Sequence, residues 1–300
     1  MLTIAIRFAL YANLTLLFGW PLFALYATRN GACGPSARHF LLLTLVAVLL
    51  SVGGMLAMTA SMSGVPIIDV DRASIAAMVL ETPMGLAWQA RMAALAAVAA
   101  LAIAHHPVAR LARVGFAAAA LASLAWTGHG AAGEAAAGRV QLVADIVHLL
   151  AAGAWVGAIV ALGLMLTHDA SRLTSADFVS MHRTLDGFST VGTIVVALLI
   201  VTGLVNSWIL VGPHGVGQLS GNQYIRLLAI KLALFAAMLG LAAINRFRLT
   251  PALRRDLQAG SMPVGALRAL RRSIALEFGL ATSVLAIVAW LGTLMPPASS

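Results

Sequence analysis

Long apolar runs alternate with short polar segments along almost the whole chain. A helix needs roughly 20 apolar residues to cross a bilayer core of about 30 Å, and eight of the runs are of that order. The segments between them contain helix-terminating residues, such as Gly212-Pro213. The pattern therefore predicts an all-α, polytopic membrane helix bundle with about eight transmembrane helices, at residues 5–27, 40–62, 84–104, 111–129, 141–167, 189–211, 224–245 and 273–294.

The first run is expected to be a transmembrane helix and not a cleaved secretion signal. Its apolar stretch from Phe8 to Ala27 is longer than the apolar region of a signal peptide, and a second run follows it directly. We therefore expect a single transmembrane domain over residues 1–300, with four helices in residues 1–139 and four in residues 140–300.

Arginines mark every second loop of this arrangement. Lysine and arginine in short loops are retained on the cytoplasmic side of a membrane. Both termini are therefore expected outside, in the periplasm if the host is a Gram-negative bacterium. The arginines concerned make up 13 of the 19 basic residues: Arg29, Arg38, Arg110, Arg113, Arg172, Arg183, Arg246, Arg248, Arg254, Arg255, Arg268, Arg271 and Arg272.

Composition agrees with a membrane protein and limits the other classes. Hydrophobic residues make up 61% of the chain, charged residues 10%, and the mean hydropathy is +0.96, which no soluble domain of this length needs. The net charge of +9 is explained by the loop arginines and by affinity for anionic lipid headgroups. It is therefore poor evidence for binding of nucleic acid.

Several catalytic classes are excluded by absent motifs. Cys33 is the single cysteine, so an intramolecular disulfide and a CxxC metal site are both impossible. The sequence has no nucleotide-binding loop, no nucleophile elbow and no HExxH pair. These absences argue against an ATP-driven pump, a hydrolase and a metalloprotease, and we expect no enzymatic activity.

Three methionines lie near the outer end of the second run. Met55, Met58 and Met62 are spaced three and then four residues apart, which places them on one face of a helix. One interpretation is that they fill irregular gaps between helices. The other is that their thioethers form a ladder of soft ligands for Cu(I).

A polar stripe runs from the end of the fourth run into the fifth. His129 ends the fourth run, and Asp145, His148 and Trp155 follow on one face of the fifth. Ionisable residues within the membrane are costly and are functional candidates by default. Asp145 could orient the His148 imidazole as a metal ligand, or the pair could only fix helix packing.

Two further basic residues lie at a depth similar to Asp145. An ion pair of Asp145 with Lys231 or with Arg91 would be the least costly explanation of all three charges. Asn206 points toward the same region and could join the network or contact a ligand. A further stripe on the third run consists of Met84, Trp88 and Arg91.

Several segments resemble the bacterial copper resistance protein D (CopD) family. The resemblance is strongest across about 148–251 and is consistent in layout over the first four helices. It is carried by His148–Gly157, Phe188-Ser189, Thr202–Trp208, Arg226–Lys231 and Asn245–Pro251.

The resemblance implies an eight-helix protein of the bacterial inner membrane that takes part in copper homeostasis. Family members are thought to move copper across that membrane or to receive it from periplasmic carriers, often a small β-sandwich protein of the CopC type. This chain has no such domain, so the resemblance implies a separate CopC-like partner. The residues that it singles out are His148, Trp155, Asn206 and Lys231.

Ligand chemistry supports copper independently. Thioether and imidazole groups suit Cu(I), whereas Mg²⁺ or Ca²⁺ would want several carboxylates together. We therefore expect copper to enter from outside past Met62, Met58 and Met55 and to be held by His129 and His148. Two alternatives are a b-type cytochrome with His129 and His148 as haem ligands, and a scaffold that binds no metal.

Overall fold

Helices account for nearly all of the chain that the computed structural model describes, which comprises residues 1–27, 34–104, 106–127, 136–166, 175–212, 222–259 and 264–297. No strand occurs within these ranges. The helices are α1 (Leu2–Ala27), α2 (Ala37–Ser63), α3 (Arg72–Glu81), α4 (Pro83–Ala100), α5 (Pro107–Ala122), α6 (Ala136–Leu166), α7 (Ser175–Val211), α8 (Gln223–Ile244), α9 (Thr250–Gln258) and α10 (Val264–Leu291).

Each of the eight apolar runs coincides with a helix, which confirms the predicted all-α bundle. Within the described residues, seven helical segments are long and apolar enough to cross a membrane. The run that falls short is α4, which has 18 residues and whose hydropathy is lowered by Gln89 and Arg91. It nevertheless packs against α2 and α5.

Two short helices were not expected. One is α9, which continues from α8 through a π-helical turn at Asn245–Leu249. The other is α3, whose N-cap Asp71 accepts a hydrogen bond from the backbone N–H of Ser74 at 2.6 Å. That backbone hydrogen bond stabilises the carboxylate and lowers the pKa of Asp71.

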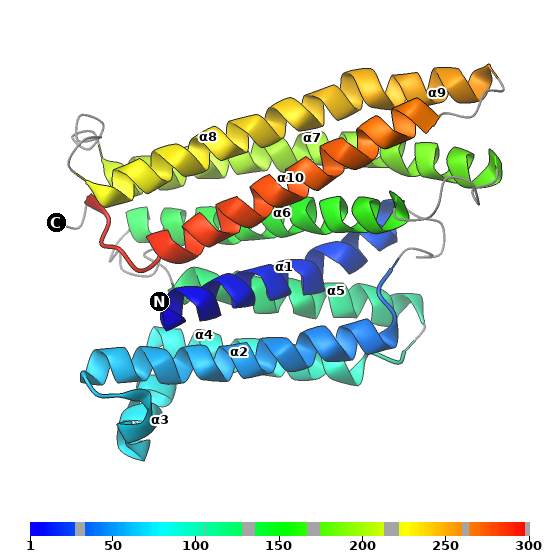
Figure 1. The fold of residues 1–300 in the computed structure, drawn as a ribbon. Coiled ribbons are helices and arrows are strands. Elements are labelled where there is room, and N and C mark those ends of the chain that lie inside the picture. Colours follow the sequence, from blue (N-terminus) through cyan, green and yellow to red (C-terminus); the bar gives the residue numbers. More distant parts are fainter. Residues whose placement is uncertain are drawn as a thin grey trace.

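The first helix lies in the middle of the bundle. In Figure 1, α2, α4 and α5 lie on one side of α1, and α6, α7, α8 and α10 lie on the other. It packs against helices of both groups, with α2 and α5 in the first and α6 and α10 in the second. We call α2–α5 the N-terminal helices and α6–α10 the C-terminal helices. Contact between the two groups therefore runs mainly through α1.

Glycines allow α1 and α6 to approach closely. A Cβ added at Gly19 would stand 2.9 Å from the Cα of Gly157 and 2.8 Å from the carbonyl carbon of Gly153, so the backbones touch without side chains between them. The sequence has the GxxxG pattern, typical of close helix packing in membranes, at Gly153–Gly157. The structure shows Gly19 as its partner on α1.

The exposed surface of the bundle is apolar, as lipid contact requires. On α7, the exposed residues recur every three or four positions, which places them along one face of the helix. The chain is a multi-pass membrane protein, and such a protein needs an apolar face to contact lipid tails. This face is formed by Ile194, Leu198, Val201, Leu204 and Trp208.

The start of α1 and the end of α10 lie at the same end of the bundle (Figure 1), and we call it the terminal end. Arg110, Arg113 and the arginines of α9 belong to the opposite end. This arrangement fits the expected topology. The direction in which the bundle crosses the membrane stays a prediction.

Candidate functional site

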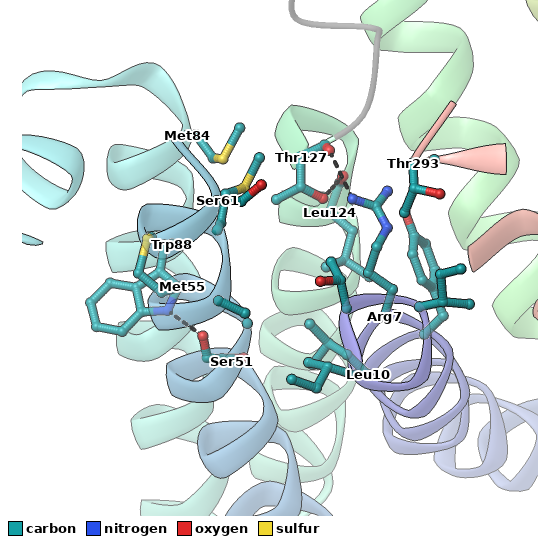
Figure 2. Close-up of a pocket in the computed structure, with 18 of the residues that line it drawn as sticks. Arg7, Leu10, Ser51, Met55, Ser61, Met84, Trp88, Leu124, Thr127 and Thr293 are labelled. Carbon is teal, nitrogen blue, oxygen red and sulfur yellow. Dashed lines mark hydrogen bonds between the residues drawn. The ribbon is translucent and has the colours of Figure 1, made fainter. Parts of the chain in front are cut away.

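A cavity of about 400 Å³ opens near the terminal end, between α1, α2 and α4. Four methionines line it: Met55 and Met58 from α2, Met84 from α4, and Met1. Figure 2 shows Met55 and Met84 on the α2 and α4 side, with Arg7 of α1 across from them. We call this space the methionine cavity.

The predicted methionine ladder is brought to this cavity only in part. Met55 and Met58 line the cavity, but Met62 is 68% exposed and is not among the lining residues. Met84 joins them because it shares a face of α4 with Trp88, as its spacing in the sequence indicated. Nothing in the local sequence pointed to Met1.

A hydrogen bond fixes the wall that carries three of these methionines. The indole N–H of Trp88 donates to the backbone oxygen of Ser51 at 3.0 Å, which joins α4 to α2 (Figure 2). Trp88 therefore acts between helices here, and its position sets Met84 opposite Met55 and Met58.

Two arginines also line the methionine cavity. Arg91 is only 4% exposed, and its Nε and Nη1 atoms have no hydrogen-bond partner among the described residues. Arg7 donates from Nη1 to the backbone oxygen of Thr127 at 3.5 Å, and its Nε is also without a partner in the described part of the chain. Sequence reasoning singled out Arg91 but missed Arg7, which lies near the start of the first run.

A separate polar network joins α6, α7 and α8, and we call it the histidine network. The amide of Asn206 donates to the Asp145 carboxylate at 2.6 Å. Lys231 lies close enough to interact electrostatically with both Asp145 and His148. The cation that faces Asp145 is therefore Lys231, whereas Arg91 faces the methionine cavity.

The orientation of His148 is set by α7. Its Nδ1 atom lies 2.9 Å from the Thr202 hydroxyl oxygen, and that hydroxyl donates its one proton to the backbone oxygen of Leu198 at 2.6 Å. Thr202 therefore accepts a hydrogen bond from Nδ1–H, which leaves the lone pair on Nε2. Gly203 lies beside the ring, and a Cβ there would stand 3.6 Å from its Cε1, an ordinary van der Waals contact.

Trp155 contributes to neither of these groups. It is buried, packs edge-on against Phe235 with ring centroids 5.8 Å apart, and hydrogen-bonds the Glu277 carboxylate. Asn245 donates to the same carboxylate at 2.5 Å. Trp155, Asn245 and Glu277 line a second cavity of about 290 Å³.

The described residues contain no group of three or more His, Cys, Asp or Glu side chains that could hold a metal ion. His129 lies outside the described residues, so its predicted part in the site stays a prediction.

Comparisons with known proteins connect this arrangement to copper. Residues 1–139 match the family model described as "Copper resistance protein D-like, N-terminal domain", and residues 182–291 match the model "Copper resistance protein D". His148 and Trp155 lie between these two ranges.

A full-length relative spans that gap. The protein named "Copper resistance protein D" from Pseudomonas syringae pv. tomato is 43% identical over 98% of this chain and 97% of its own length. No solved structure matches the chain. The chain belongs to the copper resistance protein D family.

Proposed function

We propose that the protein binds Cu(I) in the methionine cavity, on the periplasmic side of the bacterial inner membrane, and moves it across that membrane. The observation that supports this most directly is the convergence of Met55, Met58 and Met84 on one cavity at the terminal end, with the fully exposed Met1 also in its lining. Thioethers prefer soft ions such as Cu(I). The described lining residues include no carboxylate that would favour Mg²⁺ or Ca²⁺ instead.

His148 is the proposed second ligand on the path inward. With the proton held on Nδ1 by Thr202, the Nε2 lone pair is ready to bind a metal without first losing a proton. His148 is not among the residues that line the methionine cavity, and α1 lies between α2 and α6. The proposed path therefore has two separate stations and not one mixed site, with His129 proposed as a ligand between them.

The expected partner follows from the terminal end. If the arginine-rich loops are cytoplasmic, the methionine cavity opens near the periplasm, where a separate CopC-like protein could deliver copper. In this proposal copper is the cargo of the protein and not a resident cofactor.

A Cu(I) titration against a colorimetric chelator tests the proposal on the detergent-purified protein. The double variant Met55→Leu/Met58→Leu removes two thioethers from the cavity, and Met62→Leu is the matched control because Met62 is exposed outside it. We expect the double variant to lose at least about tenfold in affinity, which is about 1.4 kcal/mol. Met62→Leu should bind as the unmodified protein does.

Equal Cu(I) affinity of the unmodified protein, the double variant and Met62→Leu would contradict binding in the methionine cavity. His148→Ala, titrated in the same way, tests the second station. An absorption spectrum of the same samples distinguishes the proposal from a b-type cytochrome, since a Soret band would identify haem.

Transport needs a second experiment. Proteoliposomes loaded with a Cu(I) chelator should accumulate external copper through the unmodified protein and much more slowly through His148→Ala. Binding without any uptake would limit the function to holding copper at the membrane.

A further inference from the structure

The methionine cavity carries positive charge before any ligand enters. Its thioethers are neutral, Arg7 and Arg91 are cations, and no acidic residue occurs among the described residues that line it. A bare Cu⁺ would add a further positive charge beside these two guanidinium groups, and like charges close together repel.

Arg91 points to what is missing. It is nine-tenths buried, yet Nε and Nη1 have no hydrogen-bond partner in the described part of the chain. A buried guanidinium with unused donors is costly unless an anion accepts from it. The Nε–H and Nη1–H groups point to different sides of the guanidinium, and each can donate a charge-assisted hydrogen bond to an anion.

Thioethers and guanidinium donors reach this space from different elements. Met55 and Met58 come from α2, and Met84 and Arg91 come from α4, where their spacing of seven residues places them on one face. The cavity thus offers soft ligands for a metal and hydrogen-bond donors for an anion in the same volume.

We propose that the cavity binds copper together with an anion, as Cu(I) coordinated by one soft monovalent anion that accepts hydrogen bonds from Arg91. This rests on the proposed function and specifies its cargo. Chloride and a small thiolate share the required chemistry, because each is a soft ligand for Cu(I) and carries one negative charge. The complex of Cu⁺ with such an anion is neutral, so it enters the cavity without adding to its charge.

The first experiment measures Cu(I) affinity of the full-length protein at constant ionic strength in three media: sulfate, bromide in place of chloride, and sulfate with a monothiol. Competition against the same chelator is run on the unmodified protein, Arg91→Gln and Arg91→Lys. In the bromide medium or in the thiol medium, we expect the unmodified protein to bind Cu(I) at least about tenfold more tightly than Arg91→Gln does in the same medium. That comparison cancels the effect of the anion on copper in solution.

Arg91→Lys keeps the charge but not the paired donors, so it should retain part of the gain. X-ray absorption at the copper edge then identifies the anion. A bromide neighbour in the unmodified protein that is lost in Arg91→Gln supports a halide, and a gain in thiol alone supports a thiolate.

Other outcomes overturn the inference and separate it from the proposed function. If copper binds through Met55 and Met58 with equal affinity in all three media, the anion is not needed and the proposed function stands. If no medium gives copper binding, the proposed function fails and takes this inference with it.

Discussion

The methionine cavity and the histidine network balance their charges in opposite ways. In the network, Asp145 has both Asn206 and Lys231 as partners. In the cavity, Arg91 has donors without a partner in the described part of the chain, and no carboxylate among the described lining residues pairs with it. The carboxylate of the network is thus neutralised within the protein, whereas the cavity leaves a positive charge that a ligand can neutralise.

Separating the N-terminal helices from the C-terminal helices should lower the stability of the protein more than any other change. Gly157→Leu places a side chain against the backbone of Gly19, where neither helix can yield locally. We expect a loss of more than about 3 kcal/mol in stability, beyond the usual cost of overpacking, and a large drop in the thermal melting temperature in detergent.

Gly240→Leu on α8 is the matched control, since a Cβ at Gly240 meets nothing within 4 Å. It should change stability by less than about 0.5 kcal/mol. Equal melting temperatures for the two variants would contradict the close packing of α1 on α6.

Removing the negative charge of the histidine network should be the next largest effect. In Asp145→Asn, the new amide oxygen can still accept from Asn206, so only the charge that faces Lys231 is lost. An ion left unpaired inside a protein costs about 3–5 kcal/mol, and the melting temperature should fall accordingly. The double variant Asp145→Asn/Lys231→Met should recover most of that loss; failure to recover would show that the two charges are not coupled.

Removing a buried charge from the methionine cavity should raise the stability of the protein instead of lowering it. Arg91→Met removes a buried cation with unused donors, so we expect the copper-free protein to become more stable by about 1–3 kcal/mol. Chemical unfolding in mild detergent, without copper, measures this difference. A destabilised Arg91→Met protein would mean that Arg91 already has a partner in the ligand-free state.

The smallest expected effect concerns the orientation of His148. Thr202→Val keeps the shape of the side chain but removes the oxygen that accepts from Nδ1–H. Losing such a supporting partner typically costs roughly 10–100-fold in metal affinity, with little change in fold. Thr282→Val on α10 is the control, because Thr282 makes the same bond to its own helix and is only partly buried.

The sequence predicted the helices well because each must supply its own apolar length and satisfy its own backbone hydrogen bonds in lipid. The similar depth expected for Arg91, Lys231 and Asp145 stays a prediction. The direction that each side chain faces could not be read from the sequence, because it depends on which helices become neighbours. Arg91 therefore reached the methionine cavity and not Asp145.

Short or marginal features could not be predicted from the sequence for other reasons. Met62 continues the spacing of Met55 and Met58 but lies one turn further along the helix, where its side chain is exposed. The α3 helix is too short and polar to give an apolar run, and its one local signal was Asp71 three residues before Ser74. Gly19 was the one residue in the sequence that indicated the central position of α1.

The position of α1 sets an order for assembly during synthesis. Of the described helices, α1 is made first, yet the glycine face at Gly19 is covered only after α2 to α5 have been made and α6 has entered the membrane. Until then, Asn13 and Thr15, which are buried in the finished bundle, must be accommodated by lipid or by the insertion machinery. The first of these helices is thus among the last to be enclosed, and neither group of helices can complete its packing without it.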